Sequence, residues 1–117
     1  MKEIKAYVRP HMLDKVIHAL EEAGFTDITV DDLRAVRRGL REDDLEYSVE
    51  LAERYMSVVK LALVVRNRDV TSVTRIIAER ARTGVKGDGL IYVSPVEDAI
   101  HIRTGTRGEP AVESPEK

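Results

Sequence analysis

The chain of 117 residues contains no cysteine and no tryptophan, and it contains a single phenylalanine. Without cysteine, disulfides and thiolate metal sites are excluded, and a reducing compartment is compatible with the chain. Aromatic residues make up only 4% of the sequence, whereas hydrophobic residues make up 43%. The core must therefore be built from valine, isoleucine, leucine and alanine, and the length predicts one small domain.

The sequence also lacks long apolar runs and an excess of positive charge. No run approaches the ~20 residues that cross a bilayer, and the start, Met1-Lys2-Glu3-Ile4, has no signal-peptide pattern. The 19 basic residues face 21 acidic ones, for a net charge of −2, whereas general nucleic-acid binding favours a basic excess. We therefore expect a cytoplasmic protein with no nucleic-acid partner and no direct membrane insertion.

The hydrophobic pattern predicts alternating strands and helices. Residues 3–9 alternate as in a half-buried strand, and residues 12–23 have the spacing of an amphipathic helix that ends at Gly24. The other expected elements are strands at 28–36, 56–65, 90–93 and 99–102 and a helix at 70–81 capped by Asp69. This order is the α+β, ferredoxin-like βαββαβ pattern, in which both helices cover one face of an antiparallel sheet. Because the strand at 56–65 is apolar on both faces, we expect oligomerisation through the open face.

Two segments fit no strong pattern. Residues 37–55 place basic residues before acidic ones without a single apolar period, which indicates a short surface helix or a long loop. Loops of this length in a small domain are usually functional or disordered, although a run of charges is also typical of a solvated segment. Residues 110–117 hold proline and charge, and we expect them to form a disordered tail after a domain that spans 1–109.

A basic, glycine-rich loop spans residues 82–90 and contains Gly87-Asp88-Gly89. Glycine allows positive φ and close approach to a ligand, and successive N–H groups in such loops bind anions. Arg82, Lys86 and Arg103 could add positive charge for a phosphate. The Asp-Gly pair is also a common hairpin turn, so the loop alone leaves both a phosphate loop and a bare turn open.

Several motifs together make the chain resemble the PII signal-transduction proteins over residues 1 to about 109. They are Arg9-Pro10, Gly24 with Thr29-Val30, Lys60, Ala81-Arg82-Thr83-Gly84, Gly87-Asp88-Gly89, Ser94-Pro95-Val96-Glu97 and Ile102-Arg103-Thr104-Gly105. The resemblance implies a homotrimer that binds adenine nucleotides between neighbouring subunits. It also implies that residues 37–55 form a protruding loop that docks on a regulated transporter or enzyme. It favours phosphate binding by the glycine-rich loop over a bare turn.

The resemblance further implies which residues form these sites. Thr29 and Val64 belong to the adenine side, whereas the glycine-rich loop and Arg103 belong to the phosphate side. The expected nucleotide-binding residues are Thr29, Arg38, Val64, Gly87, Asp88, Gly89, His101 and Arg103. The expected docking residues of the protruding loop are Arg41, Asp43, Tyr47 and Leu51.

The chain departs from the family's pattern at the phosphate end. The family's phosphate-binding lysine is Leu90 here, and one of its two arginines is His101, a mostly neutral side chain. The glutamine that ligates magnesium and supports 2-oxoglutarate binding is Gly39. We therefore expect AMP or ADP to be favoured over ATP as the effector, without a metal. The chain resembles the divergent PII-like branch, which acts in nitrogen or carbon metabolism.

Other departures and alternatives complete the prediction. The family's glycine before Arg38, its uridylylated tyrosine and its phosphorylated serine are Arg37, Leu51 and Val49 here. One alternative is a classical nitrogen-regulatory PII protein that senses ATP and 2-oxoglutarate. A second is a small phosphohydrolase on the same fold, for which Asn67 is the only asparagine, and a third is a trimeric scaffold without a ligand. No P-loop and no nucleophile–base pair is evident, so we expect no enzyme and no catalytic residue.

Overall fold

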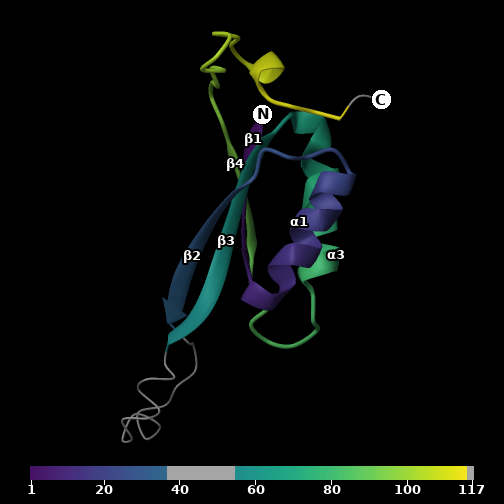
Figure 1. Cartoon of the computed structure of the whole chain (residues 1–117), viewed down its shortest axis with the longest axis vertical. Helices are drawn as coiled ribbons and strands as arrows, with labels where there is room; N and C mark the ends of the chain where they lie inside the picture. The colour runs from purple at the N-terminus through teal and green to yellow at the C-terminus, as the bar shows by residue number, and fades with distance from the viewer. Residues whose placement is uncertain (37–54, 116–117) are drawn as a thin grey trace, which may run out of the picture.

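The computed structural model describes residues 1–36 and 55–115 (Figure 1). Four strands and two helices form the body of the molecule, and they are β1 (Lys2–Val8), α1 (Leu13–Glu22), β2 (Thr29–Val36), β3 (Tyr55–Val65), α3 (Val70–Ala81) and β4 (Ile91–Pro95). Three short 3-10 turns accompany them, at η1 (Pro10–Met12), η3 (Asn67–Asp69) and η4 (Glu109–Ala111). Each of these strands and helices agrees within one or two residues with a prediction from the sequence, whereas the 3-10 turns were not predicted.

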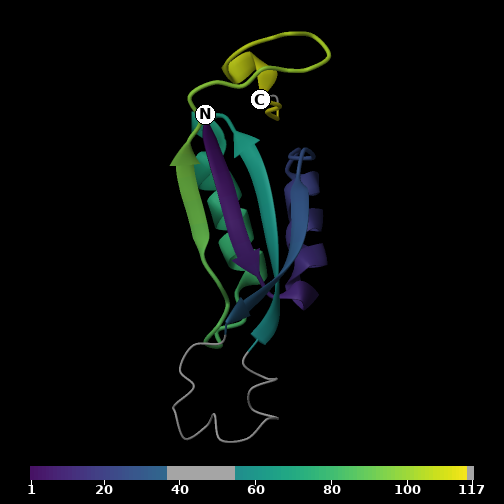
Figure 2. The ribbon, with the colours of Figure 1, turned by 90° about the vertical axis from the view of Figure 1, so that its left-hand side faces the viewer.

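The four strands form one antiparallel sheet in the order β2-β3-β1-β4. Both helices cover the same face of this sheet, and the opposite face is open (Figures 1 and 2). This arrangement confirms the ferredoxin-like α+β fold predicted from the order of the elements. Since β1 and β3 are central, the two ends of β1 lie at the two ends of the sheet, next to different loops.

The core lies between the sheet and the helices and is almost entirely aliphatic. Alternate residues of the central strands point into it, and α1 and α3 add one apolar stripe each. The fully buried members are Ile4, Ala6, Val16, Leu20, Leu61, Val65, Val73 and Ile77. Each large aliphatic side chain buried in this way contributes about 1.5–3 kcal/mol, so a chain with few aromatic residues still builds a core.

Two local predictions about the helices have different outcomes. Helix α1 ends where expected, because Gly24 adopts φ +96° directly after the last turn. Asp69 lies at the N-terminal end of α3 but does not cap it through its side chain. The 3-10 turn that precedes α3 already gives Asp69 helical backbone angles (φ −97°, ψ −7°). Its carboxylate instead accepts a hydrogen bond from the Ser114 hydroxyl at 2.5 Å.

The C-terminal region differs from the prediction in two ways. The strand expected at 99–102 is wrong, because only an isolated bridge joins Ile100 to Arg107. The chain reverses between them, where the Gly105 N–H donates to the His101 carbonyl at 2.7 Å. The disordered tail expected at 110–117 is also not what the structure shows up to residue 115. These residues lie against the body of the molecule, with Val112 only 8% exposed.

Candidate functional site

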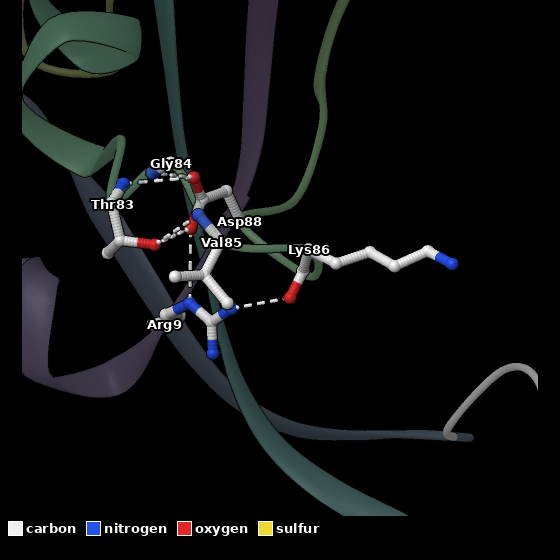
Figure 3. A network of polar contacts seen from close by, with 6 residues as sticks. All are labelled: Arg9, Thr83, Gly84, Val85, Lys86 and Asp88. Atoms are coloured by element: carbon white, nitrogen blue, oxygen red, sulfur yellow. Dashed lines mark hydrogen bonds and ion pairs between the residues drawn. The ribbon is translucent and has the colours of Figure 1, made fainter.

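The glycine-rich loop connects α3 to β4 at the end of the sheet where β1 finishes, and Asp88 organises it (Figure 3). Its carboxylate accepts hydrogen bonds from the backbone N–H groups of Thr83 at 2.9 Å and Gly84 at 3.0 Å. The Thr83 hydroxyl donates to the same carboxylate and accepts a bond from the Val85 N–H at 3.2 Å. The carboxylate of Asp88 therefore holds the first half of the loop in a closed turn.

Arg9, the residue that follows β1, ties this loop to the sheet. Its Nε donates to Asp88 Oδ1 at 3.2 Å, and its Nη2 donates to the Lys86 carbonyl at 2.7 Å. The two bonds use the fork of the guanidinium on neighbouring acceptors. The Lys86 side chain extends away from this network (Figure 3). The loop is thus fixed at its middle, and its lysine remains available to the surroundings.

The hydrogen bonds of the loop favour the ionised form of Asp88. The Thr83 side chain contributes most, followed by the Thr83 backbone N–H, while the Gly84 N–H and Arg9 act in the same direction. Together they hold the pKa of the Asp88 carboxyl well below its usual range, against an opposing effect of desolvation. Asp88 is therefore an anion at every physiological pH, and its charge is already matched by donors within the protein.

All three glycines of the loop have conformations that other residues rarely adopt, and Gly84 has φ +83°. Gly87 has φ +101° and Gly89 has φ +103°. A Cβ at Gly89 would lie 1.7 Å from the Tyr7 carbonyl oxygen, so the loop packs directly on the backbone of β1. The adjacent hydrogen bond from the Tyr7 N–H to the Leu90 carbonyl, at 2.9 Å, fixes the same approach. Only glycine permits this contact.

The second half of the loop offers backbone donors. Within the described residues, the N–H groups of Lys86, Gly87 and Gly89 donate no hydrogen bond, whereas those of Thr83, Gly84 and Val85 do. Consecutive N–H groups without acceptors, such as those of Lys86 and Gly87, can form a concavity that binds anions. Phosphate binding by this segment stays a prediction.

A cavity of about 400 Å³ lies beside this loop on the open face of the sheet. Apolar and aromatic side chains form most of its wall, and Arg9 and the loop glycines form its edge; the lining includes Tyr7, Met56, Val58, Gly87, Gly89, Leu90 and Tyr92. Tyr7 and Tyr92 pack edge to face, with ring centroids 5.8 Å apart. Leu90 is 62% exposed, so an apolar side chain stands where the family's pattern places a lysine.

Thr29 and Val64 lie at the other end of the sheet, where they line a second cavity of about 350 Å³. The Thr29 hydroxyl donates to the Ala62 carbonyl at 3.3 Å. Strand pairing places Val64 opposite Glu3 at the start of β1, whereas the glycine-rich loop follows the end of β1. The structure therefore brings Thr29 and Val64 together but does not bring them to the loop.

His101 and Arg103 belong to the segment that follows β4, which lies at the end of the sheet where β1 begins (Figure 2); Ala99 of this segment and Thr29 line the same cavity. The Arg103 side chain is exposed, whereas His101 Nδ1 is buried and has no hydrogen-bond partner among the described residues. The remaining predicted residues, Arg38 of the nucleotide set and Arg41, Asp43, Tyr47 and Leu51 of the docking loop, lie outside the described residues. The described residues of the predicted nucleotide site thus form two groups, which lie at opposite ends of the sheet within one chain.

Reasoning from the sequence missed the structural roles of Arg9 and Thr83. Both appear in motifs shared with the PII proteins, but no pattern indicates that they bind the same carboxylate. The contact between Arg9 and Asp88 joins positions 79 residues apart. The available signal was local: a threonine five residues before an aspartate, within a glycine-rich loop, is suited to side-chain-to-backbone bonds that close a turn.

The fold, the glycine-rich loop and the turn after β4 define a small α+β protein whose candidate binding residues lie at the two ends of its central strands. A family model described as "Nitrogen regulatory protein P-II" matches residues 1–106. The chain belongs to this family. The assignment establishes a general role in signal transduction and nitrogen regulation.

Relatives with known names agree with this assignment. A nitrogen regulatory protein P-II of Nostoc punctiforme is 38% identical over 112 residues, covering 96% of this chain and 100% of its own length. A protein P-II 2 of Methanothermobacter thermautotrophicus is 39% identical over 116 residues, with 96% and 97% covered. The crystal structure of Arabidopsis thaliana PII bound to citrate matches with a TM-score of 0.77 and 37% identity, over 94% of this chain and 90% of that one.

No helix within residues 1–36 and 55–115 is long and apolar enough to span a membrane.

Proposed function

We propose that the protein is a PII-like regulator that binds an adenine nucleotide between neighbouring subunits of a homotrimer. The observation that carries this proposal is the row of backbone N–H groups at Lys86, Gly87 and Gly89, which donate to no described residue. The clamp of Arg9 and Asp88 holds these donors in place before a ligand arrives. Preorganised donors of this kind suit the phosphates of a nucleotide.

The separation of the two predicted groups supports a site shared by two chains. The phosphate-side loop follows the end of β1, whereas Val64 lies opposite Glu3 near the start of β1, and Thr29 on β2 is in register with Lys5. About five residues of extended strand separate the level of Val64 from the end of β1, or roughly 17 Å, which is too far for the base and phosphate of one AMP. A neighbouring subunit that brings its Thr29 end to this loop would complete the site.

Two positions support a preference for AMP or ADP over ATP. Leu90 is exposed at the end of the loop and supplies no charge, and His101 replaces an arginine of the family's pattern. Each phosphate added to the nucleotide adds negative charge that fewer cations compensate. Lys86 in the loop and Arg103 after β4 remain as cations for the phosphates, which suits one or two phosphates.

The output of the regulator is proposed to be the loop at 37–55. Nucleotide binding would change the order of this loop and so the affinity for a regulated transporter or enzyme of nitrogen or carbon metabolism in the cytoplasm. Such coupling requires the nucleotide to bind the two states of the loop differently. The loop follows β2 at the same end of the sheet as the glycine-rich loop, which supports direct contact with a nucleotide bound there.

Calorimetric titration of the purified protein with AMP, ADP and ATP tests the proposal, with and without magnesium plus 2-oxoglutarate. We expect AMP or ADP to bind and 2-oxoglutarate to have no effect. ATP binding that tightens with 2-oxoglutarate would favour the classical nitrogen sensor, which the names of the relatives support. Absence of heat with every nucleotide would overturn the proposal.

A pair of matched variants sharpens this test. Leu90→Lys restores a cation at the end of the loop and should tighten ATP binding more than AMP binding. Leu90→Gln removes the same apolar surface without adding charge, so it controls for the change in polarity. Equal effects of the two variants on ATP would contradict the role assigned to charge at this position.

A further inference from the structure

The segment formed by residues 109–115, which we call the C-terminal strap, crosses the end of the molecule beside the N-terminus and the ends of the helices (Figures 1 and 2). It lies beyond the residues 1–106 that match the family model. Its first anchor is Glu109, whose Oε2 accepts a bond from the Asn67 N–H at 3.1 Å and lies 3.2 Å from the Met1 α-amino group. The Asn67 N–H and the amino group hold the pKa of the Glu109 carboxyl below its usual range.

The middle and the end of the strap are anchored as well. Arg66 Nε donates to the Val112 carbonyl at 3.0 Å, and the Val112 side chain is buried. Ser114 bridges two side chains, since its hydroxyl donates to Asp69 and accepts a bond from Arg68 Nη2 at 3.0 Å. Polar contacts thus recur along its whole length and reach residues 42 to 46 positions away in the sequence.

The strap forms one wall of the second cavity. Ala111 and Val112 line it together with Thr29 and Val64, and Glu3 and Asp27 are also among the lining residues. A cavity with apolar walls and acidic residues among its lining suits a planar nucleobase that carries an amino group, such as adenine. Val112 is the only buried side chain of the strap, and the hydrogen bonds that anchor the strap are exposed or partly buried, so a segment held in this way can open without unfolding the core.

We propose that the C-terminal strap is a movable wall of the base-side cavity, so that a bound nucleobase and the docked strap stabilise each other. This inference rests on the proposed function and names a control element within that site. Coupling between two events is reciprocal: if docking of the strap tightens base binding by some factor, the base favours docking by the same factor. Docking of the strap then responds to the bound base, whereas the glycine-rich loop binds the phosphates.

Hydrogen exchange of the full chain tests one direction of this coupling. The Ala111 and Val112 N–H groups donate at 2.9 Å to the Gly108 and Glu109 carbonyls within the turn η4, so their exchange reports whether the strap is ordered. Adenosine and AMP should slow this exchange, whereas inorganic tripolyphosphate should not, because it engages only the phosphate side. Unchanged exchange at saturating AMP, or equal protection by tripolyphosphate, would overturn the inference.

Shortening the chain tests the other direction. A chain that ends at Gly108 should bind AMP and adenosine at least about fivefold more weakly, within the usual range of coupling between sites, and should bind tripolyphosphate unchanged. Val112→Ala should weaken the binding of AMP and adenosine by a smaller factor and should also leave tripolyphosphate binding unchanged. Val93→Ala is its control, because Val93 is a half-exposed strand residue that lines neither cavity.

The two failures are distinguishable. If the full chain binds no nucleotide, the proposed function and this inference both fail. If the full chain binds AMP and the shortened chain and Val112→Ala bind it equally well, only the inference fails. A shortened chain that does not fold leaves the result to Val112→Ala and to hydrogen exchange of the full chain, which need no deletion.

Discussion

Replacement of Gly89 by alanine should destabilise the glycine-rich loop strongly, because the added methyl group has no space. Its φ of +103° is unfavourable for other residues, and an added Cβ would lie 1.7 Å from the Tyr7 carbonyl oxygen. Real Cβ contacts stay beyond 3.0 Å, so Gly89→Ala must push the loop and β1 apart by roughly 1.3 Å. The obstacle is backbone, not a flexible side chain that can turn aside.

The cost of this substitution can be worked from its parts. Alanine at positive φ costs about 1–2 kcal/mol. Separation of the loop from β1 also breaks the bond from the Tyr7 N–H to the Leu90 carbonyl, worth about 0.5–1.5 kcal/mol, and crowding adds about 1–3 kcal/mol. We therefore expect Gly89→Ala to lower the free energy of unfolding by about 2.5–6.5 kcal/mol.

Gly84→Ala is a matched control within the same loop. Gly84 has φ +83°, and an added Cβ there meets no atom within 4 Å. It should lose only the backbone contribution, about 1–2 kcal/mol. Urea unfolding of both variants at one protein concentration, followed by circular dichroism, gives the comparison. Losses equal within about 0.5 kcal/mol would refute the argument from close approach to Tyr7.

Three further predictions concern the core, the loop clamp and the strap. Ile77→Ala should lower the free energy of unfolding by about 2–5 kcal/mol because Ile77 is fully buried, whereas Ile102→Ala, fully exposed, should change it by less than about 0.5 kcal/mol; thermal and urea unfolding check this pair. Arg9→Met should speed hydrogen exchange at 83–88 and weaken binding of AMP and tripolyphosphate together, and Arg34→Met, an exposed strand arginine, should do neither. Because the folded pKa of Glu109 lies below its ordinary 4.5, its stabilising contribution is complete above that pH and is lost as pH falls through the folded pKa. The difference in melting temperature between wild type and Glu109→Gln should therefore shrink on acidification below pH 4.5, and a constant difference would contradict this assignment.

The sequence predicted most of the fold because periodicity records what each element buries. Strand β1 and helices α1 and α3 each have one apolar face with the spacing of the element, and β3 is a nearly continuous apolar run, as in a central strand. Gly24 ended a helix as expected, because positive φ after a last turn needs glycine. These are local signals, and each of them can be seen within about a dozen residues.

The predictions that failed all depend on contacts distant in the sequence. Asp69 was expected to cap its own helix but binds Ser114, which lies 45 residues further on. The tail at 109–115 has a composition typical of disorder, yet a few anchors such as Arg66 to Val112 hold it in place. The strand at 99–102 has an apolar pattern but lacks a partner strand. A local pattern cannot show which polar groups meet after folding.

The candidate site was predictable in membership but not in arrangement. The resemblance supplied Thr29, Val64 and the glycine-rich loop, and the structure shows that they belong to separate ends of the sheet. Asp88 illustrates the limit most clearly. The family pattern places it with the phosphate loop, whereas its carboxylate is occupied by Thr83, Gly84 and Arg9. In this geometry the Asp88 side chain builds the loop, and we propose that the neighbouring backbone binds the ligand.

Strand β1 links the two ends of the proposed mechanism. Its last residues contact the glycine-rich loop through Tyr7, and its first residue contacts the strap through the amino group of Met1 and Glu109. Being central in the sheet and buried on its helical face, β1 carries both ends as one rigid unit. In a trimer whose sites are shared, each nucleotide would therefore join the loop of one chain to the strap of the next. One subunit would then bind the base of each nucleotide and its neighbour the phosphates. Three nucleotides would be needed to join the three subunits of the trimer in a closed ring.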